Sequence, residues 1–214
     1  MLISKIMTRS LFVASPEMTL GEARAIMERE EIGYLPVLNK NSDLVGIVAR
    51  SDIFKANPSL ETSPDASEAS YLLGRLSVEK AMVKNVITVQ VDEVVEKAAR
   101  IMADRAIGCL PIMSGLTLAG IITETDIFRF FVGAFGARHK GTRITINARE
   151  RPGQIATLVN AIAKEGGNIV AVVTSEGDDA SRRRMTLKIT GLSLAAVEAA
   201  AGKLDDAEIE DIRE

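Results

Sequence analysis

The first hydrophobic pattern in the chain has the period of an amphipathic helix. Leu20, Ala23 and Met27 fall on one face of that helix. Thr19 stands just before them, and Glu22 follows Thr19 by three residues, which is the spacing of a capping box. The pattern therefore predicts a helix that begins directly after Thr19.

Two short strands are predicted after this helix. Gly33 is expected to end the helix, because glycine adopts the left-handed backbone conformation without steric cost. Leu35–Leu38 is a short apolar run typical of a buried strand, the polar segment 39–43 supplies a turn, and Leu44–Ala49 is the return strand.

The same pattern occurs a second time. Gly33–Val37 returns 75 residues later as Gly108–Ile112, and Ser51–Phe54 returns 74 residues later as Thr125–Phe128. The order of these matches indicates an internal duplication. The second copy predicts a helix over 94–105 and strands over 109–113 and 118–123, with Asp92 expected to cap the helix. Between the copies, the polar segment 55–70 predicts an exposed linker.

The hydrophobic pattern changes after residue 141. Alternating residues predict strands over 143–148, 168–174, 185–189 and 208–212. Helical spacing of apolar residues predicts one helix after Arg151–Gly153 and another around Leu194–Leu204. The order strand, helix, strand, strand, helix, strand is that of a ferredoxin-like layer, so the expected fold class is α+β with a tandem repeat followed by a ferredoxin-like domain.

Composition narrows the classes of function that fit. The 214-residue chain has a formal net charge of −3, so a nucleic-acid-binding role is not expected, and the basic run Arg182–Arg184 is expected to be solvated. Cys109 is the one cysteine and His139 the one histidine, which argues against a disulfide, a metal site and a catalytic pair. Neither a signal peptide nor a membrane-spanning stretch is evident, so we expect a cytoplasmic protein that is not an enzyme.

The duplicated motif resembles CBS domains, which occur as tandem pairs. The resemblance rests on the Gly-x-x-Pro of Gly33–Pro36 and Gly108–Pro111 and on Gly120-Ile-Ile-Thr-x-x-Asp126. It implies two copies packed about a pseudo-twofold axis, with two related clefts that take adenosine-containing ligands such as AMP, ADP, ATP or S-adenosylmethionine. The repeats are expected over 1–76, including the linker 55–70, and over 77–137.

The strand–helix junction of the second copy carries the chemistry that such a cleft needs. Thr123 and Asp126 stand three residues apart, so both side chains can point to one side of the junction. A carboxylate there can accept hydrogen bonds from ribose hydroxyls, and free N–H groups at the helix start favour phosphate. The alternative is that Asp126 only caps the helix. The resemblance further implies a base pocket, with core packing as the alternative role, for Ile87, Thr88, Cys109, Leu110 and Pro111.

The first copy departs from this pattern at its own junction. It keeps the carboxylate, as Asp52, but Ala49 stands in the place of Thr123 and Arg50 in the place of Glu124. The two clefts are therefore expected to be unequal, with the Asp126 cleft the better nucleotide site.

The segment 141–214 resembles an ACT domain, a regulatory module that often dimerises through its sheet and binds amino acids at a strand–helix turn. The motifs are Arg151-Pro152-Gly153-Gln-Ile and Gly-Gly-Asn168-Ile169, and the resemblance implies that these named residues form the ligand turn. Arg151 is bulkier than the residue expected in amino-acid-binding members. A dimerising or transmitting role is therefore the alternative.

Two CBS copies followed by an ACT domain form an arrangement that is similar to the AcuB-type acetoin-utilisation regulatory proteins of bacteria. They imply a non-catalytic homodimeric regulator that senses an adenine nucleotide and passes the change to the ACT domain or to a regulated enzyme. An amino-acid sensor acting through the ACT turn and a ligand-free dimerisation scaffold remain as alternatives. Neither a cofactor nor a metal, nucleic-acid or membrane partner is expected.

Overall fold

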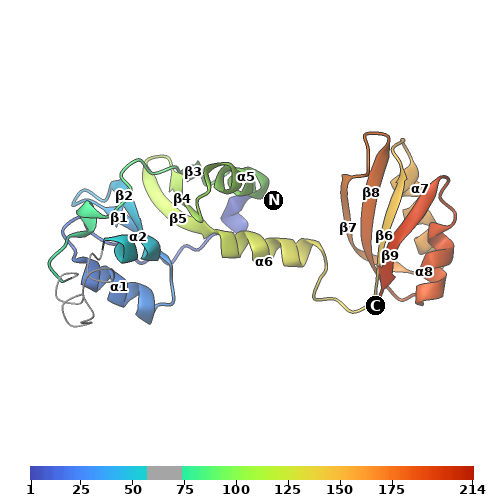
Figure 1. The fold of residues 1–214 in the computed structure, drawn as a ribbon, viewed down its shortest axis with the longest axis horizontal. Helices are drawn as coiled ribbons and strands as arrows, with labels where there is room; N and C mark the ends of the chain where they lie inside the picture. Colours follow the sequence, from blue (N-terminus) through green and yellow to red (C-terminus); the bar gives the residue numbers. More distant parts are fainter. Residues whose placement is uncertain (57–73) are drawn as a thin grey trace. The chain divides into compact units, whose positions relative to one another are not determined.

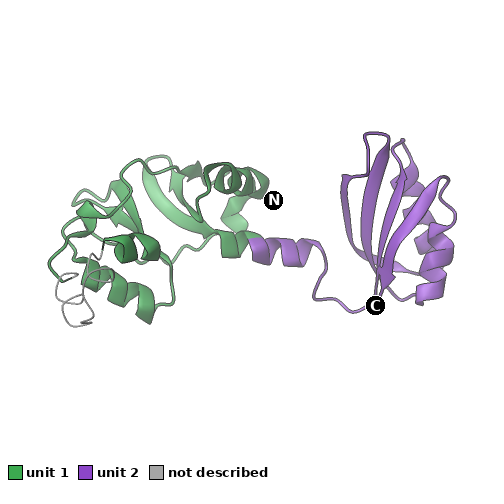
Figure 2. Cartoon of the chain, viewed as in Figure 1, with its two compact units in different colours: residues 1–127 green, residues 128–214 purple. Residues whose placement is uncertain are grey.

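The computed structural model describes residues 1–56 and 74–214, which divide into two compact units, residues 1–127 and 128–214 (Figures 1 and 2). The first unit contains both copies of the duplicated motif, and helix α6 (Glu124–Ala134) runs across the boundary. Most of the predicted linker 55–70 lies outside the described residues.

The first copy has the elements that its hydrophobic pattern predicts. The N–H of Glu22 donates to Thr19 Oγ1 at 3.2 Å, and the N–H of Thr19 donates to Glu22 Oε2 at 2.9 Å, so the capping box is confirmed. The two strands pair antiparallel. The elements are α1 (Leu20–Arg29), β1 (Tyr34–Leu38), β2 (Leu44–Ala49) and α2 (Arg50–Lys55).

Helix α1 does not end on glycine, so that prediction was wrong. Glu31 adopts the left-handed conformation, with φ of 54°, and the N–H of Ile32 donates to the carbonyl of Met27 at 3.0 Å. This closes the helix two residues before Gly33 in a Schellman-type turn. Ala106, with φ of 50°, stands at the equivalent place in the second copy.

The second copy repeats this layout. Strand β3 pairs parallel with β4, and β4 pairs antiparallel with β5. The predicted cap from Asp92 was wrong, because the helix begins after Val94 without a side-chain cap, and the N–H of Val95 donates to the carbonyl of Met1 at 2.9 Å. The elements are η2 (Val78–Lys80), β3 (Val89–Gln90), α5 (Val95–Arg105), β4 (Cys109–Ser114), β5 (Thr117–Thr123) and α6.

The two copies exchange their leading segments. Ile3, in η1 (Ile3–Lys5), is fully buried, and its N–H donates to the carbonyl of Glu93 beside the start of α5 at 2.8 Å. In the second copy, the N–H of Val78 donates to the carbonyl of Met18 beside the start of α1, also at 2.8 Å. Each leading segment therefore completes the other copy, and Figure 1 shows the N-terminal segment next to α5.

The second unit has the predicted ferredoxin-like order. Its sheet has the strand order β7-β8-β6-β9, all antiparallel, and helices α7 and α8 cover one face (Figure 1). Ile144, Leu158 and Leu187 are among the fully or almost fully buried residues between sheet and helices. The elements after α6 are β6 (Thr142–Arg149), α7 (Gln154–Lys164), β7 (Asn168–Glu176), β8 (Arg182–Thr190), α8 (Leu194–Ala201) and β9 (Ala207–Arg213).

Candidate functional site

A cavity of about 460 Å³ lies between the two copies in the first unit. We call it the Asp52 cleft. Ala49 and Asp52 reach it from the junction of β2 and α2 in the first copy, while Ile87 and Cys109 reach it from the second copy. Its full lining is Tyr34, Ile47, Ala49, Ser51, Asp52, Lys55, Val83, Asn85, Val86, Ile87, Ala106, Ile107, Gly108, Cys109 and Pro111.

Some of the predicted site residues line this cleft, and others do not. Ile87, Cys109 and Pro111 face Asp52 of the other copy, because the exchange of leading segments brings residues 83–87 against β2. Thr88, Leu110, Thr123 and Asp126 do not line the Asp52 cleft.

Leu110 is a correction to the predicted base pocket. It is fully buried in β4, where it pairs with Ile122 of β5. Successive side chains of a strand point to opposite faces, so Cys109 and Pro111 face the cleft while Leu110 faces the core. Its role is core packing, the alternative that the sequence left open.

Asp52 is fixed by the start of α2. The N–H of Ala49 donates to Asp52 Oδ2 at 2.9 Å, and the N–H of Arg50 donates to the carbonyl of Gly33 at 2.9 Å. The carboxylate therefore holds the helix start through a single backbone contact, and the other oxygen, Oδ1, can accept further hydrogen bonds.

The junction of the second copy is more tightly closed. The N–H and the hydroxyl of Thr123 both donate to Asp126 Oδ2, at 2.9 and 2.7 Å, and the N–H of Asp126 donates to Thr123 Oγ1 at 3.3 Å. Asp126 and Thr123 thus form the reciprocal contacts of a capping box.

The wall of the cleft at Cys109 is buried and acidic. Burial, followed by the negative charges of Asp52 and Glu124, raises the pKa of the Cys109 thiol to about 12. Burial, with smaller contributions from Cys109, Glu124 and Asp52, also raises the pKa of Tyr34 above its usual value. Both groups are therefore neutral near pH 7.

Tyr34 is a cleft residue that the sequence argument missed. A Cβ atom placed on Gly108 would lie 2.0 Å from the Tyr34 hydroxyl oxygen, so the ring of one copy reaches across to the backbone of the other. The repeat held a signal for this role, since Tyr34 is the counterpart of Cys109, which was already assigned to the base pocket.

A second cavity, of about 840 Å³, lies beside the start of α7 in the second unit. Arg151, Pro152 and Gly153, three of the residues assigned to the ACT turn, line it. Asn168 and Ile169 do not. Asn168 pairs with Thr190 at the opposite end of the sheet, so one copy of the chain does not bring these two residues to the turn.

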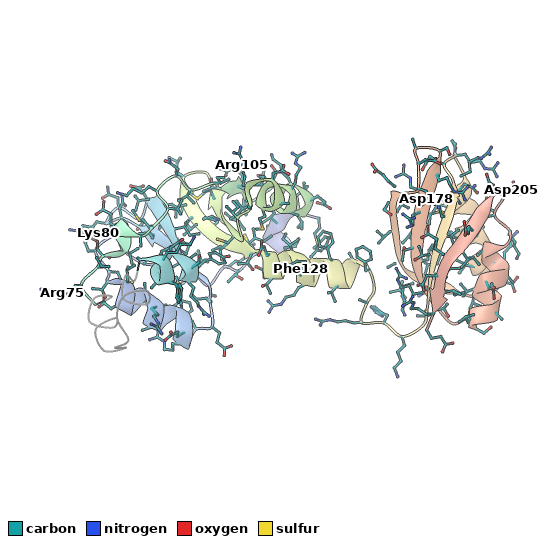
Figure 3. The ribbon with its side chains drawn as sticks, in the orientation of Figure 1. Arg75, Lys80, Arg105, Phe128, Asp178 and Asp205 are labelled. Atoms are coloured by element: carbon teal, nitrogen blue, oxygen red, sulfur yellow. The ribbon has the colours of Figure 1, made fainter. Side chains whose placement is uncertain are left out.

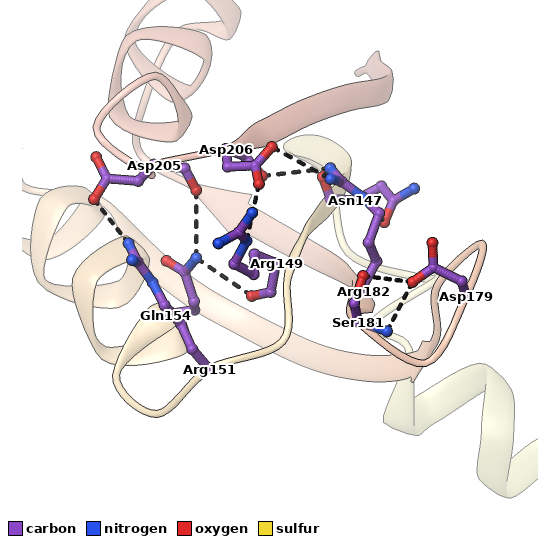
Figure 4. Close-up of polar contacts among 9 residues, drawn as sticks. All are labelled: Asn147, Arg149, Arg151, Gln154, Asp179, Ser181, Arg182, Asp205 and Asp206. Atoms are coloured by element: carbon purple, nitrogen blue, oxygen red, sulfur yellow. Dashed lines mark hydrogen bonds and ion pairs between the residues drawn. The ribbon is translucent and has the colours of Figure 1, made fainter.

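The turn beside this second cavity is anchored by the acidic loop before β9 (Figure 4). Arg151 contacts Asp205 at 2.7 Å, Arg149 contacts Asp206 at 3.1 Å, and the buried Gln154 amide donates to the carbonyls of Arg149 and Asp205, both at 3.4 Å. These contacts hold the backbone that forms one wall of the cavity.

The basic run Arg182–Arg184 is neutralised in the folded chain. Arg182 contacts Asp206, Arg183 contacts Glu150, and Arg184 contacts Glu210 and Asp178 (Figure 3 labels Asp178). Paired guanidinium groups of this kind offer little attraction to a phosphate backbone.

The part of the chain that the structure describes covers residues 1–56 and 74–214. No group of three or more His, Cys, Asp or Glu side chains is placed there to hold a metal ion. No helix in that part of the chain is long and apolar enough to cross a membrane.

Family comparisons agree with this architecture. Residues 3–59 and 78–133, more than half of the chain, match the CBS domain family, and residues 140–213 match the TTHA0829-like ACT domain family. CBS and ACT domains are regulatory modules.

Two solved structures are similar to the first unit. The CBS domain pair of protein MJ0100, in complex with 5′-methylthioadenosine and S-adenosylmethionine, is 27% identical with a TM-score of 0.53, covering 65% of this chain and 98% of that chain. AcuB from Vibrio cholerae, a protein named for acetoin utilization, is 26% identical with a TM-score of 0.53, covering 64% of this chain and 95% of that chain.

Curated relatives include enzymes, but the chain matches only a small part of them. A homoserine O-acetyltransferase from Methanohalobium evestigatum is 32% identical over 128 residues, which are 59% of this chain and 23% of the enzyme. The chain spans 23% to 31% of the length of three curated relatives, two of which are enzymes. Most of each relative therefore lies outside the match.

Proposed function

The chain belongs to the CBS domain family and carries a TTHA0829-like ACT domain, and from this premise we propose that it is a non-catalytic regulatory protein that senses an adenosine-containing ligand in the Asp52 cleft. The MJ0100 domain pair, which is similar over 65% of this chain, was solved with two adenosine compounds. AMP, ADP, ATP, S-adenosylmethionine and 5′-methylthioadenosine are the candidate ligands.

The observation that carries this proposal is the composition of the cleft. Apolar side chains such as Ile47, Val86 and Ile87 give a surface suited to a purine ring, and Asp52 stands at one side as a hydrogen-bond acceptor. A cavity that is mostly apolar with a few convergent polar groups is typical of a small-molecule site, and about 460 Å³ lies within the usual range of about 300–1,000 Å³.

Isothermal titration calorimetry of the full chain against the five candidate ligands tests the proposal. We expect saturable binding of at least one of them, and weaker binding by the variant Asp52→Asn. Asp43→Asn, which changes an exposed carboxylate in the turn between β1 and β2, is the matched control. Failure of all five ligands to bind at millimolar concentration would remove the proposed function.

The ligand acts as a regulator only if it shifts an equilibrium between two arrangements of the chain. It must bind one arrangement more tightly than the other. We propose that the CBS pair passes this change to the ACT domain or to an enzyme that the protein regulates. A role in acetoin metabolism is supported by the similarity to AcuB alone.

A second candidate function is amino-acid sensing by the ACT domain. The cavity of about 840 Å³ beside Arg151–Gly153 favours it, because the start of α7 has no side-chain cap and opens beside this cavity. Thermal unfolding in the presence of individual amino acids tests it, since a ligand that binds only the native state raises the melting temperature. A melting temperature that no amino acid raises contradicts this function.

We also propose that the protein is a homodimer, joined through the ACT sheet. Strand β7 forms one edge of that sheet and carries one charged residue, Glu176, at its end, whereas the opposite edge, β9, carries four charged residues among its seven. Charged side chains protect an exposed edge from pairing, so β7 is the edge that remains open to a second strand. Light scattering of the full chain and of Val172→Lys tests this proposal, with a monomeric wild type as the contrary result.

A further inference from the structure

Helix α6 carries an exposed apolar stripe, and Figure 3 labels its first residue, Phe128. The spacing i, i+3, i+4, i+7 places four residues on one face of the helix, and each of them is between 37% and 68% exposed. The N–H of Phe135 donates to the carbonyl of Phe131 at 2.9 Å, so the helical hydrogen bonds extend to the end of the stripe. The residues of this α6 stripe are Phe128, Phe131, Val132 and Phe135.

The stripe gathers most of the phenylalanines of this chain. Four of the six lie within residues 128–135, and none of the six is buried in a core. A helix face that meets only water normally carries polar residues. Exposed apolar patches mark interaction sites, and aromatic side chains are enriched at the centre of protein interfaces. The α6 stripe therefore indicates a surface that a partner covers.

The end of α6 is fixed to the edge strand of the ACT sheet. Gly136 has a φ of 62°, and the N–H of Ala137 donates to the carbonyl of Val132 at 3.1 Å, which closes the helix in a Schellman-type turn. A Cβ atom on Gly136 would lie 3.0 Å from Val170 Cγ1, so the glycine backbone packs against β7. The stripe thus stops one residue before a contact with β7, the edge proposed for pairing with a second copy.

A second copy of the chain is the partner that this position favours. Val170 lies two residues from the middle of β7, so a twofold axis there would bring the two Val170 residues within about 15 Å of each other. The ends of the two α6 helices would then be neighbours. Arg129 is the one charged residue within 128–135 and stands outside the stripe, so two stripes can meet without facing like charges.

We propose that the α6 stripe packs against the same stripe of a second copy, in an isologous contact about the twofold axis of the dimer. This inference rests on the proposed homodimer. Removal of the phenyl rings from water favours the association. Because α6 begins at the junction that contains Asp126 and ends at β7, the contact also gives the dimer a direct helical connection to the CBS pair.

Cysteine cross-linking of the full chain tests this contact. The natural cysteine, Cys109, is buried, so a cysteine introduced on the exposed part of α6 is the reactive one. Val132→Cys, in the stripe, is expected to give a disulfide-linked dimer on a non-reducing gel after oxidation with copper phenanthroline. Gly133→Cys is the matched control on the opposite face, where a Cβ atom would meet nothing within 4 Å, and it should remain largely uncross-linked. Equal cross-linking of the two variants, or of neither, contradicts the stripe contact.

Sedimentation velocity at several protein concentrations measures the strength of the contact. Phe131→Ser is expected to raise the dissociation constant of the dimer at least about tenfold, whereas Gly133→Ser should leave it within about twofold. A dimeric wild type whose dissociation constant is the same in both variants overturns the stripe contact but leaves the homodimer standing. A monomeric wild type overturns both. If Phe131→Ser fails to fold in thermal unfolding, the cross-linking pair still decides.

Flotation with phosphatidylglycerol vesicles examines a lipid surface as the other occupant of the stripe. We expect the wild type not to float with the vesicles. Flotation that is lost in Phe131→Ser and kept in Gly133→Ser would assign the stripe to a lipid surface and overturn the contact between copies.

Discussion

The two strand–helix junctions of the duplicated motif hold the same carboxylate in two different ways. At the Asp126 junction, one carboxylate oxygen accepts hydrogen bonds from both the N–H and the hydroxyl of Thr123. At the Asp52 junction, Ala49 has no hydroxyl, so the carboxylate accepts from the backbone alone. The carboxylate of Asp126 therefore accepts one more hydrogen bond within its helix cap than the carboxylate of Asp52 does.

The sequence ranked the Asp126 cleft as the better nucleotide site, and that ranking stays a prediction. The Thr123 hydroxyl, which the sequence offered as a ligand contact, donates to Asp126 within the helix cap. Asp52, which lacks such a partner, lines the cleft that both copies build. A hydroxyl beside an acidic residue is thus evidence for a cap before it is evidence for a binding site.

The largest expected effect comes from removing the charge at the cleft. Asp52→Asn should weaken binding of an adenosine ligand by about tenfold to a hundredfold, because hydrogen bonds to a charged group contribute about 1.5–3 kcal/mol. Asp126→Asn should change the affinity of the Asp52 cleft by less than about threefold. Calorimetry on both variants measures this, and equal losses would show that the junctions do not differ in function.

The next effect concerns the wall between Tyr34 and Gly108. Gly108→Ala should push the Tyr34 ring into the cleft and weaken ligand binding by about tenfold, because a Cβ atom there would lie 2.0 Å from the Tyr34 hydroxyl oxygen. The same substitution in a Tyr34→Ala background should have little additional effect. Such a double-mutant cycle isolates the contact between Tyr34 and residue 108. Additive losses of affinity would show that this contact does not affect ligand binding.

Exchanging the residues that distinguish the junctions should alter stability by smaller amounts. Thr123→Ala should lower the free energy of unfolding by about 1 kcal/mol through loss of the cap, and Ala49→Thr should raise it by about 0.5–1 kcal/mol. Ala49→Thr should also weaken ligand binding, because the new hydroxyl would occupy Asp52. Urea unfolding measures the first effect and calorimetry the second. A stabilised Ala49→Thr variant with full affinity would show that occupying Asp52 in the cap does not weaken ligand binding.

The last expected effect is a dependence on alkaline pH, which is absent at neutral pH. The folded state keeps the Cys109 thiol neutral, with a pKa of about 12 against an ordinary value of 9.0. Its contribution to stability is therefore complete below pH 9 and is lost as the pH rises toward 12. The stability of the wild type relative to Cys109→Ala should stay constant from pH 7 to about 8.5 and then decline. A constant difference up to about pH 10.5 would show that the thiol is not held neutral.

The order and type of most elements could be predicted from the sequence. Residues such as Leu20, Ala23 and Met27 have the helical period, the Thr19–Glu22 box lies within four residues, and alternation marks β6 and β8. These signals are local, so each depends on the chain within one or two turns. The duplication was equally evident, because Gly33–Val37 and Gly108–Ile112 match as written.

The composition of the cleft was decided by tertiary structure. Ile3 docks beside α5 and Val78 beside α1, so each copy is completed by the other, and Asp52 faces Cys109 of the second copy. No periodicity carries this information, because the exchanged segments lie about 60–90 residues from their contacts and are placed by burial of apolar side chains, which is non-directional. The sequence by itself determined that there are two related junctions with unequal residues. The packing of the two copies determined that Asp52 of the first copy faces Cys109 of the second across a cavity.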